Sequence, residues 1–339
     1  MALIEKILEF LVSGLYQFIC FHLQSLWLDL KIVHLIILWL LSILWRSEGR
    51  LHLASDSRIS FGTAGSADVG VKVMRLPIRV LGTEVDDAGK LNVLFDRTYG
   101  FCYAGNLANA VTFKLLVEDL LVDVQYPPAS VPLSFNELCN FLCRFCAKVS
   151  TEIVSRLAEQ GGYTFLVAGW CPLKETLRGA RFQLAQDAGK TVATFEEVVQ
   201  SEGEYVAVGA GDAEFDTLFA GQEVKMRTVL LTLNKVIDEG KVASVGGDIQ
   251  YGSFQKDGDF TVFGLSRISV EHVVDDGKQD CPIELCVMRY RGFELYADWN
   301  GTGDNLWSSP GFIELQVPSN NESKERFIEQ CQKIIAGGT

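Results

Sequence analysis

The chain has 339 residues and a mass of 37.5 kDa, enough for one large domain or two ordinary ones. Lys and Arg number 30 against 43 Asp and Glu, a net charge of −13, and this excludes nucleic acid as the main partner because backbone binding needs clustered positive charge. Hydrophobic residues make up 48% and charged residues 22%, which excludes a chain that is disordered as a whole.

The first forty residues are much more apolar than the rest. Phe10 to Leu28 is a run of nineteen positions without a formal charge, and Ile32 to Trp45 is a second apolar run of fourteen. A membrane-spanning helix needs about twenty apolar residues, so the first run is long enough and the second is short. The sequence has no cluster of positive charge before the runs and no small-residue cleavage site after them, so we do not expect a secretory signal.

Residues 10–45 are therefore expected to anchor the chain in a membrane. Two alternatives stay open: an apolar pro-segment docked on a partner surface, and an upstream extension that arises from a wrongly assigned start codon. In all three interpretations residues 1–41 form a segment distinct from the domain that follows.

From about Arg46 onward the sequence alternates strand-like and helix-like patterns. Residues 51–56 alternate as in a strand, with Leu51, Leu53 and Ser55 on one face and His52, Ala54 and Asp56 on the other. Residues 90–105 are predicted to form a pair of strands. Further strands are expected over residues 163–170, 179–187, 204–211, 248–254 and 260–270.

Three helices are predicted between these strands. Apolar residues recur at three- and four-residue spacing over residues 106–124, 134–162 and 224–240. In the second helix Ser134 is an N-cap candidate, Glu137 stands three positions later as in a capping box, and Gly161 ends the helix. The order of strands and helices predicts an α+β fold in which helices pack on antiparallel sheets.

The cysteine and histidine content favours a reducing compartment without a metal site. The nine cysteines form no disulfide framework, which predicts a cytoplasmic protein. Cys139, Cys143 and Cys146 recur at helical spacing among apolar residues, and no matching Cys or His pair completes a zinc site, so buried thiols are expected. No glycine-rich nucleotide motif occurs, so we expect neither a metal nor another cofactor.

Six short pieces, in order, resemble the proteasome-type N-terminal nucleophile (Ntn) hydrolases. That family includes proteasome β subunits, the peptidase of the bacterial two-component ATP-dependent protease, and the ancestral β-subunit group. The pieces are residues 54–58, Lys72 sixteen residues after Asp56, and residues 103–105, 166–170, 208–211 and 244–247. The resemblance covers residues 42–265 and implies a four-layer αββα sandwich of two sheets between helix layers, followed by an extension over residues 266–339.

The resemblance also implies a mechanism. In this family the nucleophile is the hydroxyl or thiol of the first residue of the mature chain, and its own α-amino group serves as the base. By resemblance, Asp56 would orient the lysine, Lys72 would lower the pKa of the terminal amine, and the N–H of Gly105 would stabilise the oxyanion.

The nucleophile is where this sequence departs from the family. The residue sixteen positions before Asp56 is Leu40, and the nearest hydroxyl belongs to Ser42. A hairpin shortened by two residues would keep Ser42 on the face of the family nucleophile, because strands repeat with a period of two. Supporting polar residues of the family are replaced here by Ala210, Val242 and Val245.

Two functions follow from these observations. The first is a peptidase or amidase that cleaves a peptide or protein substrate with Ser42, which cleavage after Leu41 would expose. The alternative is a catalytically inactive, membrane-tethered protein that acts in assembly or interaction. The resemblance implies a homo-oligomer in both cases.

Overall fold

The fold contains two large β-sheets and four helices in the part of the chain that the structure describes. A computed structural model describes residues 40–60, 65–85, 87–125, 133–157, 162–187, 190–275, 278–291, 293–294 and 312–316. The α+β class predicted from the order of the elements is confirmed.

The first sheet has eight strands, and the first strand of the described chain is second from one edge of it. Its order is β11-β1-β2-β12-β13-β14-β15, and β16 pairs in parallel with β13. The strands are β1 (Leu41–Ser47), β2 (Arg50–Asp56), β11 (Tyr205–Gly209), β12 (Ile249–Phe254), β13 (Phe260–Asp275), β14 (Lys278–Tyr290), β15 (Phe293–Glu294) and β16 (Phe312–Gln316). β13 continues through the boundary predicted between residues 265 and 266.

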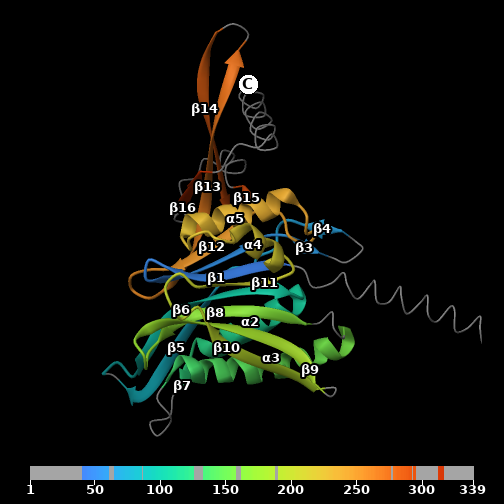
Figure 1. The fold of residues 1–339 in the computed structure, drawn as a ribbon. Coiled ribbons are helices and arrows are strands. Elements are labelled where there is room, and N and C mark those ends of the chain that lie inside the picture. The colour runs from blue at the N-terminus through green and yellow to red at the C-terminus, as the bar shows by residue number, and fades with distance from the viewer. Residues whose placement is uncertain are drawn as a thin grey trace, which may run out of the picture.

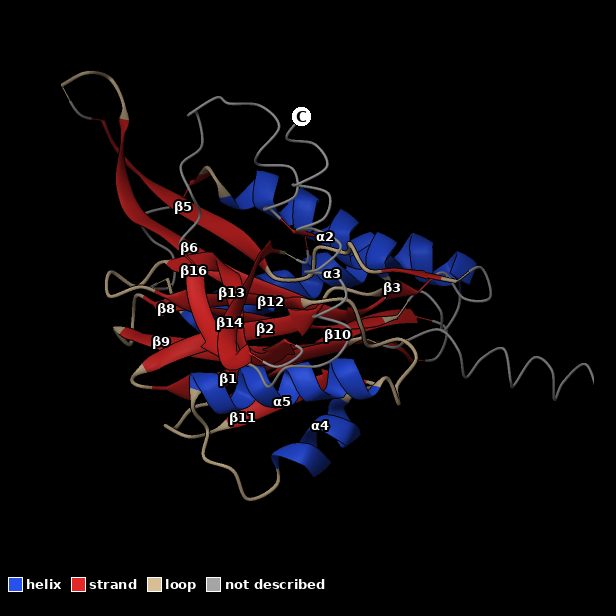
Figure 2. Ribbon diagram, turned by 90° about the horizontal axis from the view of Figure 1, so that it is seen from above, coloured by secondary structure: helices blue, strands red, loops and turns tan. Residues whose placement is uncertain are grey.

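The second sheet has six strands in the order β10-β9-β8-β6-β5-β7. They are β5 (Met74–Val85), β6 (Leu91–Gly105), β7 (Val124–Gln125), β8 (Tyr163–Cys171), β9 (Thr176–Asp187) and β10 (Lys190–Val198). The β5–β6 hairpin extends beyond the rest of the sheet (Figure 2). A separate two-stranded sheet joins β3 (Ile59–Ser60) and β4 (Ser66–Ala67).

The predicted pair of strands over residues 90–105 is wrong, because this stretch is the single strand β6. Gly100 lies inside the strand and makes no turn there. A Cβ at this position would lie 2.6 Å from a methyl group of Leu53 and 2.8 Å from the ring of Phe260. The glycine therefore allows the two sheets to approach each other closely.

The helices lie on the two sheets. α5 (Met226–Glu239), with the short α4 (Asp212–Phe219), covers the first sheet, and α2 (Leu107–Leu121) and α3 (Phe135–Leu157) pack on the second (Figure 1). Burial follows this arrangement. Ile43 and Trp45 of β1 pack with Leu230 and Leu233 of α5, whereas Leu44 belongs to the core shared with the second sheet.

The start of α3 agrees with its predicted cap. The backbone N–H of Glu137 donates to Ser134 Oγ at 3.1 Å, which satisfies one of the free donors at the helix start. Cys139, Cys143 and Cys146 are buried free thiols on this helix, as their spacing predicts.

The predicted membrane anchor over residues 10–45 is wrong in its last five residues. Residues 41–45 belong to β1, which pairs with β2 on one side and β11 on the other. Among the described residues, no helix has the length and apolar character needed to cross a membrane. The longer run, Phe10–Leu28, lies outside the described residues.

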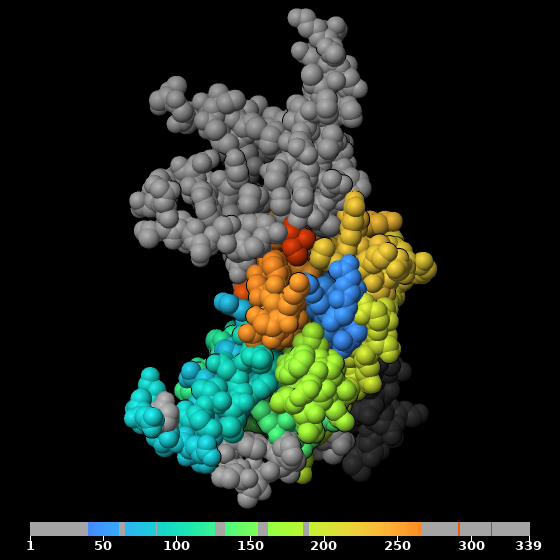
Figure 3. Space-filling model, turned by 90° about the vertical axis from the view of Figure 1, so that its left-hand side faces the viewer, coloured from blue at the N-terminus to red at the C-terminus, as the bar shows by residue number. Residues whose placement is uncertain are grey.

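The β1–β2 hairpin sets the position of the candidate site. At one end its two-residue turn lies beside the β12–β13 and β8–β9 turns, as the blue, orange and green surfaces in Figure 3 show. At the other end Ser42 pairs with Ser55, and the backbone N–H of Leu41 donates to the side chain of Asp56. The predicted site residues are therefore at the end of the hairpin opposite its turn.

Candidate active site

Asp56 ends β2, and its carboxylate is completely buried. Oδ1 accepts hydrogen bonds from Lys72 Nζ at 2.8 Å and from the backbone N–H of Leu41 at 3.0 Å. Oδ2 accepts from the backbone N–H groups of Arg58 and Gly246, both at 3.1 Å. One ammonium and three amide donors therefore provide hydrogen bonds to both oxygens of this buried carboxylate.

Lys72 is also completely buried and faces Asp56. Burial lowers the pKa of the Lys72 amine, and the charge of Asp56 and its hydrogen bond act in the opposite direction. The structure therefore joins two of the predicted site residues in one buried ion pair. A buried lysine held by one carboxylate is a common feature of sites that move protons, although structural pairs share it.

Gln250 of β12 holds the segment that carries Lys72. Its Oε1 accepts from the backbone N–H groups of Lys72 at 2.9 Å and Val73 at 3.2 Å, and its Nε2 donates to the carbonyl of Gly70. The sequence prediction missed this residue. A glutamine between Ile249 and Tyr251 in a predicted strand is the signal that could have identified it.

Ser42 is the second residue of β1 and lies between Ser55 of β2 and Val208 of β11. Its hydroxyl is completely buried and donates to the carbonyl of Tyr103 at 2.7 Å. The Cys102 thiol donates to Ser42 Oγ at 3.1 Å, and burial raises the pKa of that thiol to about 12.

The hydroxyl of Ser55 continues this polar chain. Ser55 Oγ donates to the carbonyl of Leu41 at 2.6 Å and lies 3.2 Å from Ser42 Oγ. The hydrogen bonds of Ser42 thus go to Tyr103, Cys102 and Ser55, and the structure gives it none with Lys72 or Asp56.

Leu40 and Leu41 occupy the place next to the ion pair. The N–H of Leu41 is bound to Asp56, and Leu40, 5% exposed, belongs to the core between the sheets. Leu40 can occupy this position because residue 209 of β11 is a glycine. Its φ is +114°, and a Cβ there would overlap the carbonyl oxygen of Leu40 and lie 3.1 Å from the Cβ of Ala104.

Gly105 ends β6 with a φ of +123°, and a Cβ there would lie 2.6 Å from the Cα of Tyr163. Asn106 follows as the N-cap of α2, with its Oδ1 accepting from the N–H of Asn109 at 2.8 Å. A Cβ at Gly209 would contact both the carbonyl of Leu40 and the side chain of Ala104, the residue before Gly105. Ala104 and Leu40 are therefore close together. The predicted oxyanion donor is therefore the last residue of β6 and lies close to Leu40.

Apolar side chains surround Leu41 on the side of Gly211. A Cβ at Gly211 would lie 2.9 Å from a methyl group of Val245 and 3.1 Å from the Cβ of Leu41. Val245 is completely buried, and among the described residues the buried hydroxyl of Ser244 has no hydrogen-bond partner.

Arg58 stabilises the loop that leads to Gly246. It forms a forked ion pair with Asp68, with Nε and Nη2 at 2.7 and 3.0 Å from the two carboxylate oxygens. Its Nη1 donates to the carbonyl of Ala243 at 3.2 Å. The hydrogen bond of this pair raises the pKa of the Arg58 guanidinium.

No protein-family model matches the sequence, and a search of curated proteins finds no match either. Solved structures do match. The chain is similar to Anbu, the ancestral β-subunit.

Three Anbu structures are among the matches. The protein from Yersinia bercovieri is 18% identical with a TM-score of 0.43, and the match covers 63% of this chain and 81% of that one. The Anbu complex from Pseudomonas aeruginosa, a helical assembly, is 16% identical with a TM-score of 0.45, covering 66% and 86%. Anbu from Hyphomicrobium sp. strain MC1 is 18% identical with a TM-score of 0.43, covering 66% and 84%.

Proposed function

We propose that residues 40–265 form a proteasome-like sandwich of the Ntn type that keeps the Asp–Lys frame of a catalytic site but has no terminal nucleophile in it. The chain then acts as a non-catalytic subunit in assembly or interaction. One observation carries this proposal: the backbone N–H of Leu41 donates to Asp56, so an unbroken chain passes through the place beside the Asp56–Lys72 pair.

Terminal-nucleophile chemistry has two requirements that this geometry does not meet. It needs a free α-amino group and a hydroxyl within hydrogen-bond reach of the groups that activate it. The amide of residue 42 belongs to a strand paired on both sides, and the Ser42 hydroxyl donates to the carbonyl of Tyr103.

The ion pair has a structural role that is sufficient to account for it. Asp56 connects the start of β1, the end of β2, the loop at Gly246 and the segment of Lys72. Such a pair holds four separate parts of the chain in register without any catalytic step.

Hydrolysis by Ser42 is the second candidate, and the buried Asp56–Lys72 pair is the observation that favours it. Cleavage after Leu41 would release the N–H donor from Asp56 and the carbonyl that Ser55 binds. The Ser42 hydroxyl would then have to leave the carbonyl of Tyr103 to reach a substrate.

A hydrolysis assay distinguishes the two candidates. Full-length protein and its Ser42→Ala and Lys72→Met variants are incubated with a mixture of fluorogenic peptides of varied sequence. The non-catalytic function predicts equal rates in all three samples, at the level of the buffer. A rate well above that level, abolished by Ser42→Ala, would contradict it and support the peptidase.

The proposal includes self-association, which the sequence resemblance implies. Light scattering on the full chain measures it. A mass of one chain over the micromolar range would remove this part of the proposal and leave the assignment of the site unchanged.

A further inference from the structure

The large apolar side chains exposed in the described residues are concentrated at two places. Nine are exposed in this part of the chain, and six of them belong to these places. Three lie at the end of the β5–β6 hairpin and are 55–59% exposed, namely Val85, Val93 and Leu94. The other three lie on α2 and are 44–54% exposed, namely Leu115, Leu116 and Leu120. Exposed apolar side chains that gather in this way usually mark a contact surface, whereas single ones are ordinary.

The end of the hairpin, residues 82–94, projects from the domain, and we call it the arm. The Nε of Arg79 donates to the carbonyl of Val122 at 3.0 Å, so α2 ends beside residue 79 of β5. The last pairing of β5 with β7 is at Leu81. Beyond that point the described strands give β5 and β6 no partner but each other, and the hairpin extends past the sheet (Figure 2). A two-stranded ribbon is marginally stable on its own in water, so we expect the arm to pack against a partner.

A β-bulge interrupts the regular pattern of the arm. Val80 pairs with Phe95 and Leu81 pairs with Val93, so Leu94 is an extra residue in β6. Val93 and Leu94 are consecutive in the sequence, and both are exposed at this bulge. Bulges redirect side chains and interrupt the edge of a strand. The arm therefore offers apolar side chains, and not a regular strand edge, to a partner.

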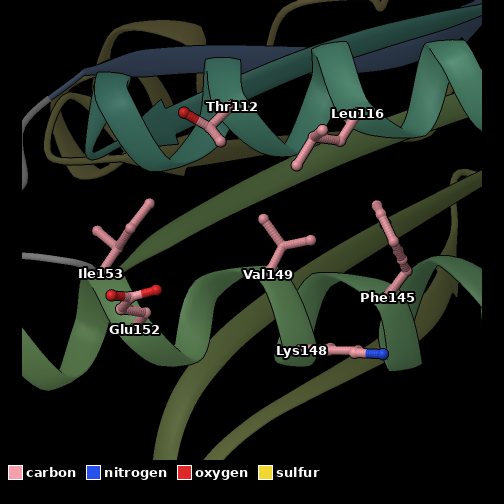
Figure 4. Close-up of a pocket in the computed structure, with 7 residues that line it drawn as sticks. All are labelled: Thr112, Leu116, Phe145, Lys148, Val149, Glu152 and Ile153. Atoms are coloured by element: carbon pink, nitrogen blue, oxygen red, sulfur yellow. The ribbon is translucent and has the colours of Figure 1, made fainter.

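A groove of about 740 Å³ between α2 and α3 adjoins the apolar side chains of α2. The residues that line it are Thr112 and Leu116 from α2 and Phe145, Lys148, Val149, Glu152 and Ile153 from α3. Apolar side chains of the two helices face each other across the groove (Figure 4). The lysine and the glutamate are exposed and lie one turn apart. The groove thus combines an apolar interior with charged side chains at its rim.

Charge complementarity favours the arm as the occupant of this groove. The chain has a net charge of −13, so two copies repel each other unless opposite charges meet locally. Residues 83–90, which form the turn of the arm, contain three carboxylates and one lysine, and Glu84 and Asp87 are exposed. Arg144 and Lys148 are exposed one turn apart on α3, where Lys148 lines the groove. The acidic turn therefore matches the basic end of the groove.

The arm cannot reach the groove of its own chain. α2 follows the end of β6 and runs back along the sheet to Arg79, so Leu116 lies about 9 Å before the helix end at Val122. The arm continues from Arg79 in the direction away from Leu116. Its strands are continuous with β5 and β6 and do not fold back. The occupant is therefore the arm of a second copy.

We propose that the arm of one copy lies in the groove between α2 and α3 of a second copy, with Val93 and Leu94 against Leu116 and the acidic turn beside Lys148. The arm and the groove are different surfaces, so each copy can bind two neighbours. The inference rests on the self-association included in the proposed function and names the surfaces that form it. It is independent of whether Ser42 is active.

Photocrosslinking tests which surfaces meet. The full chain carries a photoreactive phenylalanine analogue at Leu94, and crosslinked peptides are identified by mass spectrometry after separation by size. The expected product has the mass of two chains and joins residue 94 to a peptide from residues 112–120 or 144–153. The same analogue at Leu173, which is also 55% exposed and lies in the turn between β8 and β9, is the matched control and should not give this product.

Other products would overturn the proposal. A product with the mass of one chain that joins residue 94 to the groove would assign the groove to the arm of the same chain. A product of two chains that joins residue 94 to residues 82–94 would show that two arms meet. Equal yields of the groove product from positions 94 and 173 would show a contact without a fixed place.

Charge reversal gives a second readout, measured by light scattering over the micromolar range. Asp87→Lys and Lys148→Glu should each associate at least about threefold more weakly than the parent chain, because like charges then meet. An equal mixture of the two variants restores opposite charges in every mixed contact and should associate like the parent. A mixture as weak as the separate variants would overturn the proposal.

Leu94→Glu separates this inference from the proposed function. It should raise the concentration needed for association at least about tenfold, whereas Leu173→Glu should leave it unchanged. Circular dichroism of both variants should match that of the parent chain, since both positions are exposed. Unchanged association of Leu94→Glu would overturn this inference alone. A parent chain that stays single would overturn it together with the self-association in the proposed function.

Discussion

At the scale of single residues, the Asp56–Lys72 pair has the most consequence. A buried ion pair is weak evidence of net stabilisation, but the removal of one partner leaves a charge without compensation. This cost is the same whether or not the site is catalytic, so stability and activity have to be measured separately.

Lys72→Met should destabilise the fold by about 3–5 kcal/mol, because the Asp56 carboxylate would keep only its three amide donors. Urea unfolding followed by circular dichroism measures the change. Arg79→Met, which breaks a largely exposed pair with Asp123, is the control and should cost about 1 kcal/mol or less. Equal effects of the two variants would show that the buried pair is not a structural link.

His52 gives a prediction on pH. It is buried, its ring stacks on Trp45, and its Nδ1 lies 2.8 Å from the Tyr251 hydroxyl. Burial lowers the pKa of its imidazole from 6.5 to about 4. Only the unfolded chain gains a proton here between these two pH values. The stability from neutral His52 is therefore complete above pH 6.5 and is lost as the pH falls toward 4, by about 3 kcal/mol in all.

Urea unfolding at several pH values between 7.5 and 4.5 tests this dependence. The parent protein should lose stability more steeply than His52→Gln, which has no imidazole to protonate. If the two curves fall in parallel, other groups are responsible for the acid sensitivity.

At the scale of elements, the path of β1 depends on a glycine in its neighbour. Gly209→Ala should be severely destabilising, by about 3 kcal/mol or more, because it combines a positive φ with overlap against the Leu40 carbonyl. Gly203→Ala is the matched control. Its φ of +81° is also left-handed, but a Cβ there meets nothing within 4 Å, so a cost of about 1 kcal/mol is expected. Thermal unfolding of both variants compares them, and equal losses would contradict the close contact with Leu40.

The sequence predicts the elements whose periodicity is clear and misses those whose pattern is interrupted. The helices α2, α3 and α5 and most strands of both sheets follow from spacing alone. β5 was missed because Pro77 and its charged residues interrupt the pattern. The strand tolerates Pro77 because the parallel partner β7 reaches it only at Val80 and Leu81, so Pro77 lies on an unpaired edge.

The sequence predicts two residues of the candidate site but not how β1 is aligned with its neighbouring strands. The separation of Asp56 and Lys72 led to the buried pair. The pairing of β1 could not be inferred, because the run of Leu, Ile and Trp around Ser42 carries no mark of which residue meets Asp56. In the structure Ser42 is opposite Ser55, and the backbone N–H of Leu41 donates to the side chain of Asp56.

At the scale of the whole molecule, two sheets pack together and helices cover them, and β1 lies between β2 and the edge strand β11 of the first sheet. The residues that would have to end the chain for catalysis are part of β1. A functional terminus at Ser42 would therefore require a cut in a strand that is paired on both sides.

The most direct test of the central claim is the intact mass and N-terminal sequence of the protein made from the full reading frame. We expect a chain in which the peptide bond between Leu41 and Ser42 is intact. A mature chain that begins at Ser42, and that the Ser42→Ala variant fails to produce, would contradict the non-catalytic function and establish a terminal nucleophile.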